Sequence, residues 1–186
     1  MRLVVTREEY FEAAMRLLAS GGFGDLKIGR LCKSIGVTSG SFYNYFGNWD
    51  GFVVELLEYW EAEQTARIVK MTNVHDDPFD RIATMKELAT TVPHETEAAI
   101  RAWGNSNATV AEIQKRVDGE RYEALRNLVL AVVPDKDRAE ILAVMGITLL
   151  VGIQQWRTPV DPKEFHRLLD EYEAVIVTHS EAIGEH

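Results

Sequence analysis

Apolar residues recur at helical spacing through almost the whole chain, and this periodicity restricts its fold more than any other feature. Tyr10, Phe11, Ala14, Leu17 and Leu18, for example, fall on one side of a helix. No segment shows the sustained alternation of apolar and polar residues that is typical of a half-buried strand. We therefore predict an all-α protein of about nine helices.

Start and stop signals divide this pattern into separate helices. Thr6 and Glu9 have the spacing of a capping box, and Gly21-Gly22 favours the end of the helix that follows it. Asp77-Pro78 and Asp161-Pro162 each place a capping oxygen before a proline in the first helical turn. Beyond the first helix, the predicted helices span residues 27–35, 39–46, 49–71, 78–91, 94–105, 108–133, 136–156 and 162–183.

Composition favours an ordinary globular protein with a cytoplasmic location. The chain has 186 residues, of which 46% are hydrophobic, and this is enough for a real core. Its one cysteine, Cys32, is expected to be buried and cannot form an intramolecular disulfide. After Arg2 the chain turns charged again at Arg7, too early for the apolar region of a signal peptide, and the apolar run 141–153 is shorter than a membrane span.

Positive charge is relatively concentrated near the amino end. The whole chain has a formal charge of −9, yet residues 1–52 contain six basic and five acidic residues, a net charge of +1. A globally acidic protein still binds a polyanion when its basic residues are gathered locally. This balance is compatible with a nucleic-acid-binding segment at residues 1–52.

Residues 27–46 have the pattern of a helix-turn-helix. A short helix is followed by the turn Gly36-Val37-Thr38, and a second short helix begins at Ser39. Such a second helix enters the major groove of DNA, where small side chains allow close approach and an amide reads base edges. The residues predicted to contact DNA are Lys27, Arg30, Lys33, Thr38, Ser39, Gly40, Ser41, Tyr43, Asn44 and Tyr45, whereas Phe42 and Phe46 are expected in the core.

This part of the chain resembles the N-terminal domain of TetR-type transcriptional regulators. The resemblance covers residues 6–55 and includes Gly21-Gly22-Phe23, the turn at Gly36 and the run from Phe42 to Asn48. It implies an all-α homodimer that binds a pseudo-palindromic operator through domain 1–50. The resemblance also implies that domain 51–186 dimerises and binds a small-molecule effector.

Two positions depart from the family pattern. Ser39 and Trp49 stand where TetR-type proteins often have lysines that contact phosphate. Fewer cations weaken binding to DNA and reduce its dependence on salt. The remaining contacts would then depend on Arg2, Arg7, Lys27, Arg30 and Lys33.

The carboxyl-terminal part carries candidates for a ligand pocket and for a dimer interface. Pockets in helical proteins are mostly apolar with a few polar groups, although each candidate is also compatible with a plain core role. The predicted pocket residues are Trp60, Met85, Trp103, Tyr122, Met145 and Trp156. The all-round apolar helix near 141–153 and the apolar stripe of the last helix predict a homodimer through Met145, Leu149, Gly152, Ile153, Phe165, Leu168, Leu169 and Tyr172.

No catalytic motif is found, and neither a cofactor nor a metal is expected. His75, Asp76 and Asp77 are adjacent possible ligands, but adjacent residues rarely converge on one ion and Asp77 is expected to cap a helix. Together with the resemblance to TetR-type regulators, this predicts a ligand-responsive transcriptional regulator, most simply a repressor, and not an enzyme. The alternative is a helical small-molecule-binding or interaction protein whose binding to DNA is weakened or lost.

Overall fold

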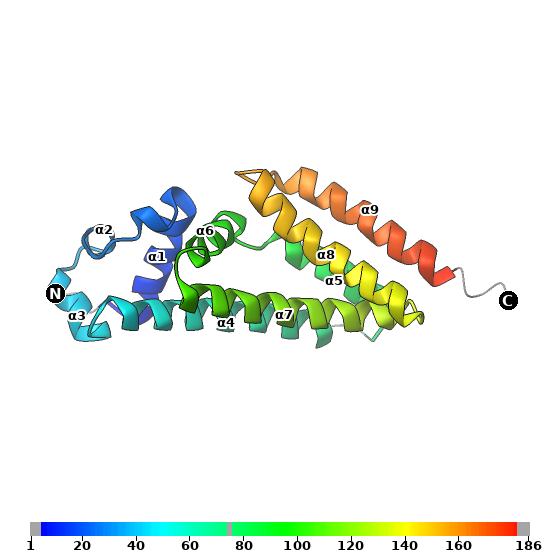
Figure 1. Ribbon diagram of the computed structural model, residues 1–186, viewed down its shortest axis with the longest axis horizontal. Coiled ribbons are helices and arrows are strands. Elements are labelled where there is room, and N and C mark those ends of the chain that lie inside the picture. Colours follow the sequence, from blue (N-terminus) through cyan, green and yellow to red (C-terminus); the bar gives the residue numbers. More distant parts are fainter. Residues whose placement is uncertain (1–4, 74–75, 182–186) are drawn as a thin grey trace. The chain divides into compact units, whose positions relative to one another are not determined.

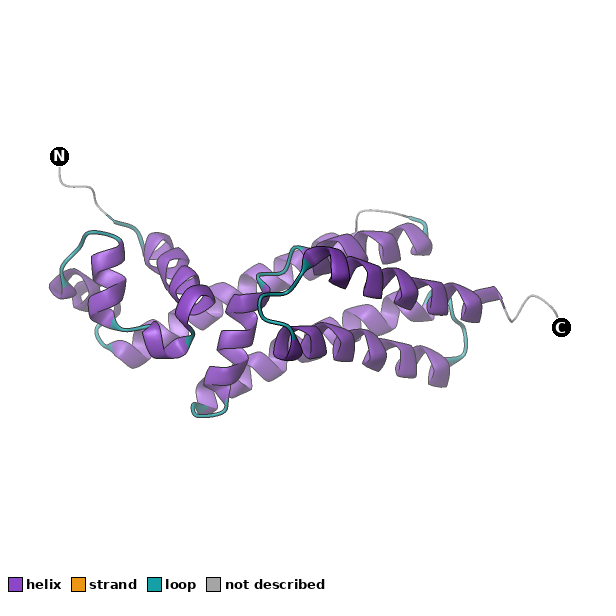
Figure 2. Ribbon diagram, turned by 90° about the horizontal axis from the view of Figure 1, so that it is seen from above, coloured by secondary structure: helices purple, strands orange, loops and turns teal. Residues whose placement is uncertain are grey.

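The protein is built from α-helices, as its periodicity predicts. The computed structural model describes residues 5–73 and 76–181, and within these ranges it contains nine α-helices, one short 3₁₀ helix and no strand (Figures 1 and 2). The elements are α1 (Arg7–Gly21), η1 (Phe23–Asp25), α2 (Ile28–Ser34), α3 (Ser39–Phe46), α4 (Trp49–Asn73), α5 (Pro78–Thr90), α6 (His94–Gly104), α7 (Ala108–Leu130), α8 (Lys136–Trp156) and α9 (Pro162–Glu181).

The predicted capping signals are confirmed. Thr6 forms the capping box with Glu9, and Asp77 accepts hydrogen bonds from the backbone of Phe79 and Asp80. Asp161 accepts one in the same way from the amide of Lys163, at 2.9 Å. These interactions lie within one turn of the chain, which is why sequence alone locates them.

The end of α7 is earlier than predicted. The helix ends at Leu130 rather than near residue 133, because bonds three residues back interrupt the regular pattern, and the amide of Ala131 is already shared between the carbonyls of Asn127 and Leu128. The amide of Val132 donates to the carbonyl of Val129 at 3.1 Å, which tightens the chain before Pro134. At α9 the predicted residues 182 and 183 lie outside the described ranges.

Two compact units divide the chain. Unit 1 contains Met1–Glu63 and Pro93–Lys115, and unit 2 contains Gln64–Val92 and Arg116–His186. The core of unit 1 includes an aromatic cluster, whose buried members are Tyr10, Phe11, Phe42, Phe46 and Phe52. The core of unit 2 is mainly aliphatic and comes from α5, α7, α8 and α9.

Helix α8 is apolar on two opposite faces. Leu142, Ala143 and Ile153 are buried inside unit 2, whereas Val144 and Met145 are exposed. By length and composition, α8 is the one helix of the described ranges that could cross a membrane, a test that core helices of soluble proteins also pass. The prediction from run length alone had considered only residues 141–153 of this helix.

Candidate nucleic-acid interface and ligand cavity

Helices α2 and α3 form the predicted helix-turn-helix in unit 1. Gly36 has a φ of 72°, a left-handed conformation that glycine adopts without a steric penalty, and it reverses the chain between the helices. The amide of Val37 then donates to the carbonyl of Cys32 at 3.0 Å. Thr38 caps α3 by accepting a hydrogen bond from the amide of Ser41 at 3.3 Å.

Aromatic packing determines which face of α3 is buried. Phe42 is fully buried and Phe46 nearly so, and their ring centroids lie 5.1 and 5.0 Å from that of Phe52. The Tyr10 ring meets Phe46 edge-on at 5.2 Å. The core role predicted for Phe42 and Phe46 is therefore confirmed.

The opposite face of α3 carries small and polar side chains. Ser39, Gly40, Tyr43 and Asn44 are exposed, and half of the Tyr43 surface is accessible. Thr38 is exposed as well. This surface, which we call the α3 polar face, exposes hydroxyls and one amide.

Ser41 is half-buried beside this face. Its hydroxyl accepts a hydrogen bond from the Tyr10 hydroxyl at 3.0 Å. Burial raises the pKa of Tyr10, so its phenol keeps the proton that it donates. Ser41 is therefore held in position but can still donate its own hydroxyl proton.

The role predicted for Tyr45 is wrong. Its hydroxyl donates to the carbonyl of Val5 at 2.5 Å, and its ring lies 5.6 Å from that of Tyr10. A tyrosine has one proton to donate, so this hydroxyl is not available to a phosphate oxygen. Tyr45 instead fastens the segment before α1 to α3.

The basic residues of unit 1 differ in whether they form ion pairs with acidic side chains. Lys27 and Lys33 are exposed, whereas Arg30 pairs with Asp25. Arg7 pairs with Glu55 and donates to the carbonyl of Tyr45 at 2.6 Å. Arg2 lies outside the described ranges.

Trp49 has a packing role where the family pattern often has a lysine. Its ring centroid lies 5.5 Å from that of Phe52 and 6.4 Å from that of Phe42. The residue thus covers the aromatic core at the start of α4. Asn48 caps this helix by accepting a hydrogen bond from the amide of Gly51 at 2.8 Å.

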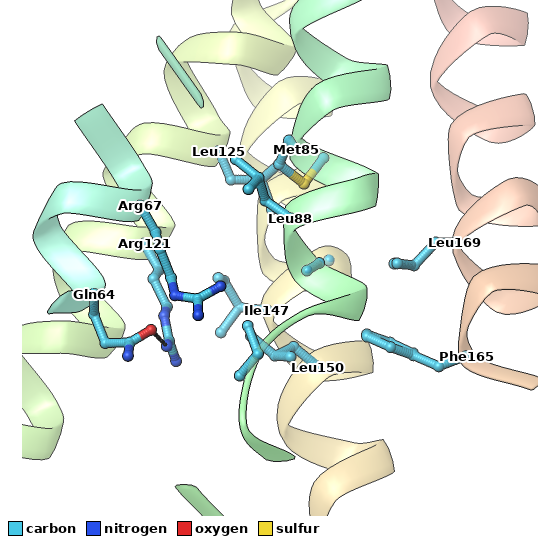
Figure 3. A pocket seen from close by; sticks show the side chains of 13 residues that line it. Gln64, Arg67, Met85, Leu88, Arg121, Leu125, Ile147, Leu150, Phe165 and Leu169 are labelled. Atoms are coloured by element: carbon cyan, nitrogen blue, oxygen red, sulfur yellow. Dashed lines mark hydrogen bonds between the residues drawn. The ribbon is translucent and has the colours of Figure 1, made fainter. Parts of the chain in front are cut away.

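Unit 2 contains a cavity of about 70 Å³ between α4, α5, α7, α8 and α9 (Figure 3). Most of its wall is aliphatic or aromatic, and its polar side chains are Gln64, Arg67 and Arg121. Arg121 donates to the side-chain oxygen of Gln64 at 2.8 Å, and Arg67 donates to the Thr91 hydroxyl at 2.9 Å. The full wall consists of Gln64, Arg67, Met85, Leu88, Ala89, Val92, Arg121, Leu125, Gly146, Ile147, Leu150, Phe165 and Leu169.

The six predicted pocket residues do not come together at this cavity. Met85 alone among them lines it. Trp60 and Trp103 are buried in unit 1, where Trp103 stacks on Phe23 at 6.4 Å. Tyr122 packs on the core of unit 2, Met145 is exposed, and Trp156 is 76% exposed.

Sequence reasoning missed the polar residues of the cavity. Gln64 and Arg67 continue the buried face of α4 that includes Leu57 and Trp60, and Arg121 lies four residues from both Val117 and Leu125 on α7. A polar residue at a core position is the signal that would have found them. The prediction instead relied on large apolar side chains, which are as common in a protein core as in a ligand pocket.

The predicted dimer residues divide into two groups. Ile153, Phe165, Leu169 and Tyr172 are wrong as interface residues, because at most 4% of each side chain is exposed and they form the subunit's own core. Met145, Gly152 and Leu168 are exposed, and Leu149 is half-buried. Ile141, Val144 and Val175 are also exposed apolar residues of α8 and α9 that had not been predicted.

No group of three or more metal-binding side chains is found in the described ranges, and His75 lies outside them. Asp77 acts as a helix cap. No metal site is assigned.

A helix-turn-helix on an all-α scaffold is typical of one class of DNA-binding proteins, and comparison with known proteins finds a matching family for this part of the chain. Residues 11–56 match the family described as bacterial regulatory proteins, tetR family. The helix-turn-helix domain of this chain is therefore a TetR-type domain, as its motifs had indicated. The search of curated proteins found no match.

Solved structures extend the likeness to nearly the whole chain. A TetR transcriptional regulator from Legionella pneumophila has a TM-score of 0.77 at 15% identity, with 92% of this chain and 98% of that one covered. FadR from Bacillus subtilis, in complex with stearoyl-CoA, has 0.72 at 13%, covering 94% and 99%. A regulator from Saccharomonospora viridis in complex with choline has 0.73 at 15%, covering 89% and 94%. At these identities the likeness shows that the chain has the fold of TetR-family transcriptional regulators.

Proposed function

We propose that this protein is a ligand-responsive transcriptional repressor that binds a pseudo-palindromic operator as a homodimer. In this proposal the α3 polar face enters the major groove and the cavity of unit 2 holds the effector. The effector then favours a conformation whose DNA-binding domains no longer match the operator. The functional boundary near residue 50, predicted from sequence, belongs to the same proposal.

The α3 polar face is the observation that carries the DNA-binding part. Phe42 and Phe46 hold α3 in unit 1, and Ser39, Tyr43 and Asn44 remain exposed on its other side. An amide such as that of Asn44 donates and accepts hydrogen bonds in the pattern that reads an adenine edge. Lys27 and Lys33, both exposed on or beside α2, supply positive charge for phosphate contacts.

Selection from a random double-stranded DNA library tests this part. The selected DNA is then titrated with wild-type protein and with the double variant Tyr43→Ala plus Asn44→Ala, at two salt concentrations. Base contacts contribute about 1–3 kcal/mol each, so we expect the variant to bind at least tenfold more weakly. Asn127→Ala, which changes an exposed amide on α7, is the matched control and should bind as the wild type does. Equal affinity of the double variant would contradict the assigned recognition helix.

The dimer and the effector site have separate support. Two DNA-binding domains must be presented about 34–36 Å apart to reach successive major grooves, so the DNA-binding proposal requires two copies. Exposed apolar residues on α8 and α9 offer the contact surface. For the effector, proteins of this fold have been solved with stearoyl-CoA and with choline, and unit 2 contains a cavity with an apolar wall.

A second candidate is a small-molecule-binding protein of this fold that has weak or no affinity for DNA. Trp49 and Ser39 replace two cations of the family pattern, Arg7 and Arg30 are ion-paired, and the Tyr45 hydroxyl is occupied. Failure to select any DNA at low salt, with the cavity still able to bind ligands, would favour this candidate.

A further inference from the structure

We propose that the cavity of unit 2 takes an organic carboxylate with a short aliphatic or aromatic body. This inference depends on the proposed function, in which the cavity is the effector site, and it names the chemical class of that effector. It follows from the polar groups at one side of the cavity and from the character of the remaining wall.

One side of the cavity presents hydrogen-bond donors. Arg67 on α4 and Arg121 on α7 lie next to each other, and Figure 3 shows the Arg67 guanidinium extending toward Ile147. The hydrogen bonds of Arg67 within the described ranges all leave from Nη1, toward the carbonyl and hydroxyl oxygens of Thr91. Among the described residues Nε and Nη2 have no such bond, and together these two donors form the planar edge that binds a carboxylate through two parallel hydrogen bonds.

Gln64 provides a further hydrogen-bond donor on the side of the cavity where the two arginines lie. It is only 3% exposed, and its side-chain oxygen accepts from Nη2 of Arg121. With the oxygen engaged, the amide nitrogen is the group that Gln64 has left to offer a ligand. The hydrogen bond also holds Gln64 and Arg121 in a fixed arrangement.

The opposite side of the cavity is apolar. Phe165 and Leu169 from α9 face Arg67 across the cavity in Figure 3, with Leu150 and Ile147 from α8 between them. A cavity needs roughly 10–15 Å³ to hold one water molecule, so about 70 Å³ accommodates a short chain or a single ring. Burial of such a body against these side chains provides affinity, and the guanidinium groups determine its orientation.

The charges of the wall select for an anion. None of the thirteen described residues that line the cavity is an aspartate or glutamate, and two are arginines. The Arg67 guanidinium in the wall disfavours a cationic ligand, because like charges brought together away from water repel strongly. A quaternary ammonium ligand such as choline should therefore be excluded.

Three probes with the same alkyl chain test the class of ligand. Octanoate, octanol and octyltrimethylammonium are titrated into the full-length protein by isothermal calorimetry, without DNA. We expect octanoate to bind at least tenfold more tightly than octanol, and no measurable binding of the ammonium probe. Equal or tighter binding of octanol or of the ammonium probe would overturn the inference on the wild-type protein alone.

Variants locate the binding site. Arg67→Met and Arg121→Met remove one guanidinium each while keeping an apolar side chain of similar length, and each should weaken octanoate binding at least tenfold. Arg67→Lys keeps the charge and should retain part of the preference for octanoate. Arg138→Met removes an exposed arginine of α8 outside the cavity and should leave binding unchanged. Unchanged octanoate affinity in both methionine variants of the cavity would overturn the assignment.

A separate measurement distinguishes this inference from the proposed function. Octanoate is added to the complex of the protein with its selected DNA. Binding of octanoate in calorimetry without release of that DNA would contradict the proposed ligand response while supporting the ligand class. Release of the DNA by the ammonium probe, with no effect of octanoate, would overturn the ligand class while supporting a ligand-responsive regulator.

Discussion

At the scale of single residues, position in the helix decides what a side chain does. Phe42 and Tyr43 are neighbours on α3, yet the first is fully buried and the second half exposed. Both locations follow from helical spacing, and sequence reasoning predicted them correctly. Tyr45 was assigned wrongly because its hydroxyl meets Val5, a residue forty positions away that local spacing does not reveal.

Gly146 is required by close packing rather than by backbone conformation. A Cβ atom added there would lie 2.5 Å from Cδ2 of Leu125 and 2.8 Å from the hydroxyl oxygen of Tyr172. That hydroxyl donates to the carbonyl of Leu142 at 2.6 Å, and burial raises the pKa of Tyr172, so the group stays protonated over the whole working range of pH.

We therefore expect Gly146→Ala to lower the free energy of unfolding by about 1–2 kcal/mol, since overpacking exceeds the gain of about 1 kcal/mol in helix propensity. Chemical denaturation measures the change. The matched control is Gly119→Ala on α7, where a Cβ would meet no atom within 4 Å, and which should be neutral or stabilising. An equal small increase in the free energy of unfolding for both alanine variants would show that Tyr172 and Leu125 move aside without cost.

At the scale of helices, the ends were predictable and the partners were not. Caps such as Thr38 and Asp77 act within one turn, so the residue types alone locate the start of α3 and α5. An apolar stripe, in contrast, looks the same whether it packs inside a subunit or against another copy. For this reason Phe165 and Tyr172, which belong to the core, were predicted as interface residues.

Helices α5 and α9 are joined by one lysine and two carboxylates. Nζ of Lys86 donates to Asp170 at 2.8 Å and to Glu173 at 2.6 Å. The hydrogen bond from Lys86 lowers the pKa of Asp170, and the bonds to Asp170 and Glu173 raise the pKa of Lys86. His166 also lies 3.6 Å from the same carboxylate oxygen of Asp170 and 3.9 Å from Glu87.

The signs of these shifts predict where the pairing stabilises unit 2. A carboxylate with a lowered pKa stabilises the fold above its unfolded value of about 3.9, and the effect is lost as the pH falls through the folded value. A lysine with a raised pKa stabilises below its unfolded value of about 10.4, and the effect is lost as the pH rises through the folded value. The contribution is thus complete between these limits.

We expect Lys86→Met to reduce stability at neutral pH and to make the acid side of the stability curve shallower. Denaturation of wild type and variant at a series of pH values measures the difference. His166 is present in both proteins, so its own titration does not account for a difference between them. The control is Lys115→Met, at an exposed lysine of α7, whose free energy of unfolding should depend on pH in the same way as that of the wild type. A constant difference down to the most acidic pH would contradict a role for Asp170 ionisation.

At the scale of the whole molecule, the fold and the cavity were predictable from the sequence to different degrees. The all-α class and the helix-turn-helix follow from periodicity and from a few turn residues. The cavity required the folded structure, because Arg67 and Arg121 are 54 positions apart and meet only when α4 and α7 pack. The overall charge of −9 gave no indication that two arginines lie in the wall of this cavity.

The assembly is expected to depend on the outer face of α8 and α9. Apolar side chains are exposed there at the spacing of helical neighbours, with Ile141 at 51%, Met145 at 42% and Leu168 at 38%. An exposed row of this kind on two adjacent helices costs free energy in water, and a second copy that packs against it removes that cost. Two copies would also supply the two recognition helices that a pseudo-palindromic operator requires.

The double variant Met145→Asp plus Leu168→Asp places charges on this face, and we expect it to weaken dimerisation about 30-fold or more, as loss of a central interface residue does. Analytical ultracentrifugation over a range of concentrations measures the change. Phe79→Asp, at an apolar residue of α5 that is 43% exposed, is the matched control and should remain dimeric. Because a monomer reaches only one half-site, the affinity of the double variant for the selected DNA should fall as well, and to a greater extent at low protein concentration. A double variant that stays dimeric would show that the copies meet through another surface, and the apolar face of α8 and α9 would then need a different partner.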